Sequence, residues 1–165
     1  MAQNDWVRIF REKIQGLGLS DSWWIEFDNN INIAQPGWEN YIRNTFARFH
    51  CSQCRHTWAS AQVPVMFHMK LDASQGSGIV KVRCCKQECK KCPTPILEQP
   101  QISSDNITVL MDKLMLKIRK KCYKENVEEN ATGFIIAGKL DGPHESRHCE
   151  GCQLGICSRR GDSNS

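Results

Sequence analysis

The sequence has no long apolar run. Nowhere in its 165 residues do the ~20 consecutive apolar residues of a membrane-spanning helix occur. Residues 1–18 carry charged side chains between their apolar ones, so they contain no continuous apolar segment of a secretory signal. Neither end shows a lipidation motif. These absences predict a soluble protein that stays in the cytoplasm.

The sequence also lacks motifs that mark several large enzyme classes. The G-x-S-x-G pattern of α/β-hydrolases and the G-x-x-x-x-G-K-[ST] pattern of P-loop enzymes do not occur. Zinc deaminases need P-C-x-x-C, whereas Glu88 precedes the C-x-x-C pair that begins at Cys89. We therefore predict that the protein is not an enzyme, and we assign no catalytic residues.

Apolar residues are thinly spread along the chain. They make up 40% of it, and the mean hydropathy is -0.50. A chain of this length suffices for one core and a small lobe held by metal, so we expect one domain over residues 1–157 and a disordered tail over residues 158–165. The net charge of +4 falls to roughly +1 if seven thiolates bind two Zn²⁺. Charge alone therefore does not identify a partner.

Cysteine is the abundant residue, with ten copies. Six of them form three C-x-x-C pairs, at Cys51 and Cys54, Cys89 and Cys92, and Cys149 and Cys152. The cytosol keeps thiols reduced, and a C-x-x-C turn lets two thiolates grip one ion. The pattern therefore favours structural Zn²⁺ over disulfides.

The number of thiols indicates two zinc ions per chain. A closed zinc site takes four ligands, so six thiolates fill one and a half sites. His144 and Cys157 are the nearest candidates for the two remaining positions. One arrangement joins the first two pairs and leaves the third pair with His144 and Cys157. The other joins the first and third pairs, and the sequence does not decide between them.

The remaining candidate ligands have simpler interpretations. Cys84 and Cys85 are adjacent and point to opposite faces of a strand, so they are excluded as ligands of one site. Cys122 lies on the apolar stripe of a predicted helix, where a small buried side chain is expected. His68 lies on a predicted strand, and a single histidine on a strand is more often a hydrogen-bonded surface or core side chain than a metal ligand.

The periodicity of the apolar residues predicts an α+β protein. Residues 5–17 and residues 104–123 have helical spacing, and Ser103 or Ser104 caps the second helix. Residues 23–33 indicate a strand interrupted at residues 28–30, residues 38–46 a short helix or turn, and residues 133–140 a final strand. Three prolines make residues 93–101 irregular.

Residues 57–71 and 79–84 predict a β-hairpin. Its far ends carry the first two C-x-x-C pairs, so antiparallel pairing brings both pairs to one end of the hairpin. We therefore expect a zinc-ribbon-like hairpin or small antiparallel sheet with three CxxC knuckles. An N-terminal helix and one long amphipathic helix flank it.

Basic residues suggest a second kind of partner. Lysines gather at the end of the second helix, where a solvated helix terminus is the ordinary interpretation. The alternative is a surface for single-stranded RNA, with aromatic side chains stacking on bases. Its candidate residues are Arg55, Lys117, Lys120, Lys121 and Lys124.

Several segments resemble the 3CxxC-type zinc-finger domain of the receptor-transporting proteins. They are FARFHCSQCRHTWASAQV, VMFHMKL, KKCY and GPHESRHCEGCQLGIC, and the likeness extends over about residues 6–157. The Cys84–Cys85 pair departs from the apolar pair expected there.

The resemblance implies a non-enzymatic zinc adaptor. Such proteins face the cytosol and help odorant, taste or opioid-type G-protein-coupled receptors reach the cell surface. A C-terminal membrane helix typically anchors them at the endoplasmic reticulum or plasma membrane, and this sequence contains none. One interferon-induced branch is associated with antiviral defence through binding of viral RNA, which is the alternative function.

Overall fold

The computed structural model describes residues 3–31, 35–125 and 149–150. The helices are α1 (Gln3–Gln15) and α2 (Ser104–Lys117), and α2 continues into a π-helical turn, η1 (Ile118–Cys122). The strands are β1 (Ser22–Phe27), β2 (Glu39–His50), β3 (Thr57–Asp72), β4 (Ser77–Cys84), β5 (Gln87–Glu88) and β6 (Leu97–Glu98).

Four strands form a mixed sheet in the order β1-β4-β3-β2. β2 and β4 pair with the central strand β3 in antiparallel fashion, and β1 pairs with β4 in parallel. β5 and β6 form a separate two-stranded ladder beyond the end of β4. The predicted hairpin of residues 57–71 and 79–84 is confirmed, with Val65 opposite Cys84 and Asp72 opposite Ser77.

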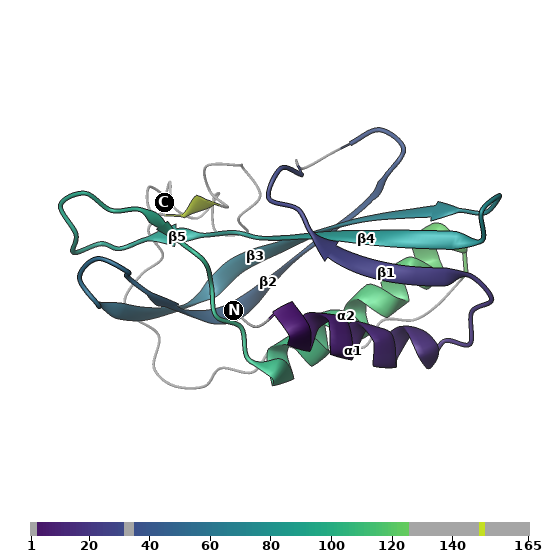
Figure 1. The fold of residues 1–165 in the computed structure, drawn as a ribbon, viewed down its shortest axis with the longest axis horizontal. Helices are drawn as coiled ribbons and strands as arrows, with labels where there is room; N and C mark the ends of the chain where they lie inside the picture. Colours follow the sequence, from purple (N-terminus) through teal and green to yellow (C-terminus); the bar gives the residue numbers. More distant parts are fainter. Residues whose placement is uncertain (1–2, 32–34, 126–148, 151–165) are drawn as a thin grey trace, which may run out of the picture.

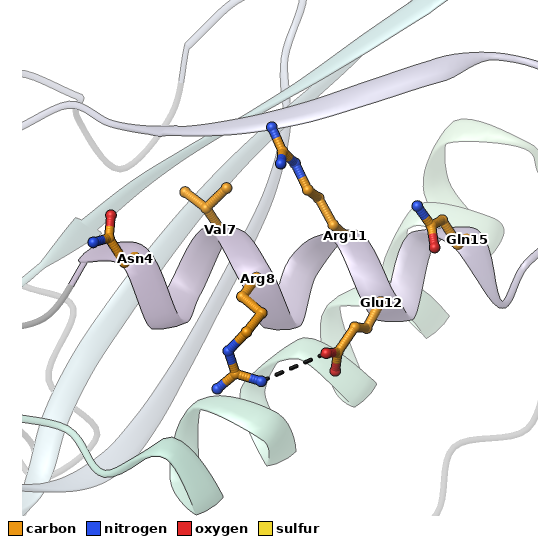
Figure 2. A pocket seen from close by; sticks show the side chains of 6 residues that line it. All are labelled: Asn4, Val7, Arg8, Arg11, Glu12 and Gln15. Carbon is orange, nitrogen blue, oxygen red and sulfur yellow. Dashed lines mark ion pairs between the residues drawn. The ribbon is translucent and has the colours of Figure 1, made fainter.

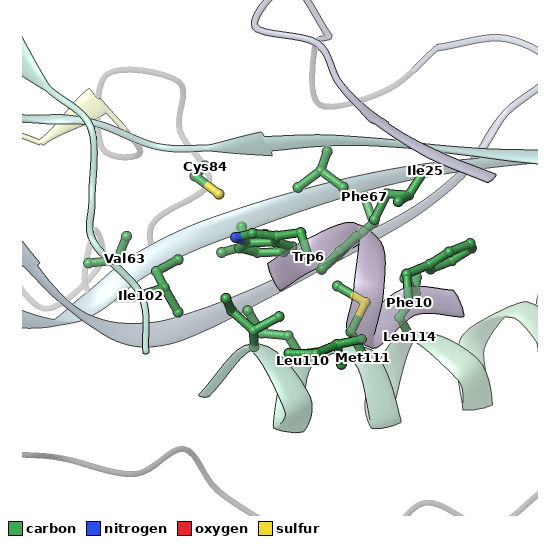
Figure 3. Packing of buried hydrophobic residues seen from close by; sticks show 14 of the residues in the cluster. Trp6, Phe10, Ile25, Val63, Phe67, Cys84, Ile102, Leu110, Met111 and Leu114 are labelled. Carbon is green, nitrogen blue, oxygen red and sulfur yellow. The ribbon is translucent and has the colours of Figure 1, made fainter. Parts of the chain in front are cut away.

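Both helices pack on one face of the sheet, which creates a two-layer molecule (Figure 1). Alternate residues of β3 face this layer, namely Val63, Val65, Phe67 and Met69, and all four are fully buried. Trp6 of α1 lies between sheet and helices, near Leu110 and Met111 of α2 (Figure 3). The core therefore extends along the sheet rather than around the cysteine pairs.

The two adjacent cysteines at the end of β4 point to opposite faces of the sheet, as predicted. Cys84 belongs to the main core, and Cys85 packs with Ile31 and Met66 in a smaller cluster. Neither lies in the group of cysteines described below. The two thiols therefore serve as small buried apolar groups.

Local signals at the ends of the helices are confirmed. The hydroxyl of Ser103 accepts a hydrogen bond from the backbone N–H of Asn106, which caps α2. Lys13 of α1 forms an ion pair with Asp112 of α2 at 2.8 Å. α2 and η1 together match the predicted helix over residues 104–123, and α1 matches the one over residues 5–17.

Two sequence predictions are wrong. Residues 38–46 were expected as a short helix or turn, but they lie mostly within the long strand β2. A β-bulge between Thr45 and Ala47 shifts the register and buries three consecutive residues, so this part of β2 lacks the alternation by which a strand is recognised in a sequence. The sheet was expected to be antiparallel, but β1 makes it mixed.

The remaining predictions concern the proline-containing link, the C-terminal residues and membrane-spanning segments. The irregular link over residues 93–101 contains the two-residue strand β6. The strand expected at residues 133–140 and the tail at residues 158–165 lie outside the described residues. In the described part of the chain, no helix is long and apolar enough to cross a membrane.

Gly78 provides a test of the packing between β1 and β4. Gly78 of β4 is the register partner of Trp23 on β1, and a Cβ atom at Gly78 would lie 2.3 Å from Cε2 of Trp23. We expect Gly78→Ala to lower the free energy of unfolding by about 1–3 kcal/mol because the indole must move. Thermal denaturation measures this, with Gly16→Ala as the control, since the nearest atom there is 3.3 Å away. Equal stability of the two variants would contradict the packing.

Candidate metal centre

The fold brings the first two C-x-x-C pairs together. Cys51 and Cys54 lie between β2 and β3, and Cys89 and Cys92 follow β5. The four Sγ atoms all lie within 4.8 Å of one another. This arrangement follows from antiparallel pairing, because β2, β3 and β4 place both connections at the same end of the sheet, on the left in Figure 1.

Each pair is held in a tight turn by backbone N–H groups. The N–H of Cys54 donates to Sγ of Cys51 at 3.4 Å, and the N–H of Lys91 donates to Sγ of Cys89 at 3.4 Å. Arg55 adopts a positive φ of 64° and closes the first turn with a bond from its N–H to the carbonyl of Cys51. Donors aimed at sulfur stabilise its thiolate form.

The thiols affect one another's protonation. The N–H of Cys54 lowers the pKa of Cys51 to about 7. The hydrogen bond between the Cys92 thiol and the sulfur of Cys51, 3.4 Å away, raises the pKa of Cys92, because it stabilises the protonated form of Cys92. Four thiolates therefore require a cation among them.

The geometry fits a tetrahedral zinc ion. Zn–S bonds of ~2.3 Å place tetrahedral sulfurs about 3.8 Å apart. Sγ of Cys51 is 3.4 Å from that of Cys92, and Sγ of Cys54 is 3.6 Å from that of Cys89. Four soft sulfur ligands complete the coordination of one zinc ion and leave no position for water, which is the chemistry of a closed structural site.

Side chains outside the four cysteines tie the two turns together. The carboxylate of Glu98 on β6 accepts hydrogen bonds from both the backbone N–H and the hydroxyl of Ser52. This contact connects the first turn to the β5–β6 ladder that carries the second pair. Sequence reasoning missed Glu98, because nothing in the pattern of residues relates positions 52 and 98.

A stack of three rings supports the other side of the first turn. Trp58 lies between Phe49 and His56, with ring centroids 5.3 and 5.7 Å away. Its indole N–H donates to the side-chain oxygen of Gln87 at 3.0 Å. His56 therefore belongs to the surroundings of the site, and Trp58 is buried rather than available to stack on a base.

The third C-x-x-C pair is only partly visible. Cys149 is buried and forms an isolated antiparallel bridge with Gln87. The other predicted ligands His144, Cys152 and Cys157 lie outside the described residues. Because Cys51, Cys54, Cys89 and Cys92 come together, the structure favours the arrangement that joins the first two pairs.

The remaining candidate ligands are placed elsewhere. Cys122 is half-buried against the main core, and burial raises the pKa of its thiol to about 11. His68 lies opposite Lys81 and Asn40 in the sheet and is buried near the ring of Trp38. Neither belongs to the four-cysteine group.

The proposed nucleic-acid residues do not form one surface. Arg55 lies next to Cys54, whereas the lysines contact the opposite end of β2, roughly 35 Å away along the strand. Lys117 lies over the ring of Tyr41, Lys121 donates to the carbonyl of Asn40, and Lys124 pairs with Glu39. Lys120 lies in η1 with Lys121.

The segment that precedes the third C-x-x-C pair carries a further zinc-related motif. Residues His144 to His148 read HESRH, which matches the H-E-x-x-H pattern that zinc peptidases carry on a helix. This segment lies outside the described residues.

Two hollows in the described part of the surface are lined by residues of α1 and of the segment that follows it. One has a volume of about 430 Å³ and is lined by a single helix, α1, from Asn4 to Gln15 (Figure 2). Within it Arg8 forms ion pairs with Asp5 and Glu12 of the same helix. We assign no ligand to it.

Comparison with known proteins identifies relatives of the whole chain. The zinc-ribbon 3CxxC family model, described as a zinc-binding domain, matches residues 44–155. Mouse receptor-transporting protein 3 is 38% identical over 157 residues, 93% of this chain and 33% of that protein. Mouse receptor-transporting protein 2 is 38% identical over 92% of this chain and 69% of its own length.

A human relative is more distant. Human receptor-transporting protein 4 is 32% identical over 93% of this chain and 64% of its own length. The chain thus spans only a third of the first of these relatives and about two thirds of the other two. No solved structure matches the chain.

Zinc binding should depend steeply on pH. Zn²⁺ displaces the thiol protons, so protons compete with the ion as the pH falls. Since the pKa of Cys51 is about 7 and that of Cys92 is raised, binding below pH 7 releases roughly three or four protons, and affinity should rise about 1,000-fold or more per pH unit. Competition with a chromophoric chelator between pH 5.5 and 7 measures this. Affinity that is flat with pH would contradict coordination by four thiolates.

Proposed function

Because the chain belongs to the receptor-transporting protein family, we propose that it is a structural-zinc adaptor that helps G-protein-coupled receptors reach the cell surface. The observation that carries the zinc assignment is the convergence of four sulfurs from two distant C-x-x-C turns. In this proposal Cys51, Cys54, Cys89 and Cys92 hold the first ion. The bound ion supplies charge neutralisation and a fixed crosslink between the turns.

A second zinc ion completes the proposal. Cys149 and Cys152 supply two of its ligands, and His144 and Cys157 the other two. In support, Cys149 is buried beside Gln87 although it does not belong to the first group of thiols. A fixed, buried cysteine outside the first site is what a second site needs.

Native mass spectrometry tests the ion count. We expect two zinc ions per chain, and one ion after either Cys157→Ser or His144→Ala, because each change removes one of four ligands. Cys122→Ser is the matched control and should retain both ions. A single ion in the unchanged chain would contradict the second site, and two ions in both variants would remove Cys157 and His144 from it.

The receptor role rests on the names of the relatives. The relatives are receptor-transporting proteins, and promoting receptor transport requires binding surfaces rather than a chemical step. Odorant, taste or opioid-type receptors are the proposed partners. The proposed place of action is the cytosolic face of the endoplasmic reticulum and plasma membrane, with attachment through a helix in a longer form.

Co-expression with a receptor tests this role. We expect the wild-type chain to raise the surface level of an odorant or opioid receptor, and Cys51→Ser to lose most of this effect because the first turn loses its ion. Cys122→Ser, which changes a thiol outside the site, should behave as wild type. Flow cytometry of a tagged receptor measures surface level. An unchanged surface level with the wild-type chain, or full activity of Cys51→Ser, would contradict the proposal.

RNA binding has weaker support in the described residues. Arg55 and the lysines of the second helix lie at opposite ends of β2, and Lys121 and Lys124 already bond within the fold. Trp58, an aromatic residue near Arg55, is buried and stacks against Phe49 and His56, so it is not available to stack on bases. We therefore retain receptor transport as the proposed function.

A further inference from the structure

We propose that Arg83 is the positioning residue of the third C-x-x-C pair, because its guanidinium holds Glu150 against the end of β4. Glu150 directly follows Cys149, the first thiol of that pair. The inference rests on the proposed second zinc site and names the residue that fixes this site on the sheet.

Arg83 connects three segments of the chain. It lies near the end of β4, on the face that the helices do not cover. One guanidinium nitrogen donates to the carboxylate of Glu150, and the other donates to the carbonyl of Ile31 at 2.9 Å. The planar fork of arginine suits two partners at once, which a lysine could not match.

Glu150 is held from both its side chain and its backbone. Its second carboxylate oxygen accepts the backbone N–H of Lys86 at 2.7 Å. Its own N–H donates to the carbonyl of Lys86 at 3.0 Å. With the bridge between Gln87 and Cys149, these bonds attach residues 149–150 to the segment that leads to Cys89.

The ion pair is well shielded from water. The side chains of Arg83 and Glu150 are 14% and 10% exposed, whereas those of Lys81 on β4 and its partner Asp28 are 28% and 26% exposed. Removing one partner from a buried pair leaves an uncompensated charge, which is costly. The attachment of residues 149–150 therefore depends on both partners being present.

The same segment connects the two proposed sites. Gln87 bridges Cys149, accepts a hydrogen bond from Trp58, and lies two residues before Cys89. The chain from Arg83 to Cys89 therefore fixes the first thiol of the third pair next to the first metal centre. The described hydrogen bonds of Arg83 go to Ile31 and Glu150 and not to the four cysteines of that centre. Replacing Arg83 should therefore weaken binding of the second ion and leave the first ion unaffected.

Zinc binding and amide exchange together test the proposal. The variants are Arg83→Met, which keeps the length of the side chain, and Glu150→Gln, which leaves the bond from Arg83 to Ile31 in place. Lys81→Met is the control, because it removes an ion pair from the same strand and face without contacting residues 149–150. Arg83→Lys keeps the charge but reaches one partner only.

We expect both Arg83→Met and Glu150→Gln to weaken the second zinc ion by about 10- to 100-fold, the usual effect of residues that orient ligands. The first ion should bind as in wild type, and Arg83→Lys should give an intermediate loss. Hydrogen exchange at the amides of Lys86 and Glu150 should accelerate in Arg83→Met. The amides of Arg48 and Gln101, which bond to each other's carbonyls elsewhere, should not change.

The two proposals fail in different ways. If the unchanged chain binds only one ion, the second zinc site is wrong, and the exchange of the Lys86 and Glu150 amides still decides whether Arg83 holds the turn. If the unchanged chain binds two ions and Arg83→Met binds both with wild-type affinity and wild-type exchange, the positioning role is wrong. An equal loss in Lys81→Met would also overturn it.

Discussion

Antiparallel pairing of β3 with β2 and β4 is the constraint on which the rest of the structure depends. The pairing places residues 51–56 and the segment after Cys84 at one end of the sheet, so two cysteine pairs about 40 positions apart in sequence become neighbours. It also sets which residues of β3 face the helices. Site and core therefore follow from one register, and a slip by one residue would invert both.

Core and metal centre stabilise different parts of the molecule. The buried cluster runs from Trp6 through the sheet to Ile118 and consists mainly of apolar side chains. Cys51 and Cys89 lie at its boundary, and the β5–β6 ladder beyond them has only two residues in each strand. The sequence predicted one core and a small lobe held by metal, and the four-cysteine group lies at this end of the sheet.

The sequence predicted those features that local patterns encode. The alternation of apolar residues along β3 continues past Pro64. The cap at Ser103 is marked by a serine before an apolar stripe, and the repeated C-x-x-C spacing indicates the four thiols. It failed where one residue disturbs a period, as at the bulge near Thr45, or where partners come from distant segments, as with Glu98 and Ser52. Parallel pairing of β1 with β4 has no local signal at all, because it is decided by packing beneath Trp23.

That parallel pairing sets an order of events during synthesis. β1 emerges from the ribosome before β2, yet its hydrogen-bonding partner is β4, some 50 residues later, and Trp23 bonds to the hydroxyl of Tyr123, 100 positions away. The ribosome adds about 5–20 residues per second, so the amino-terminal tryptophans wait several seconds without their partners. The chain thus exposes its most aromatic segment while translation continues, and this interval is when general chaperones have access to it.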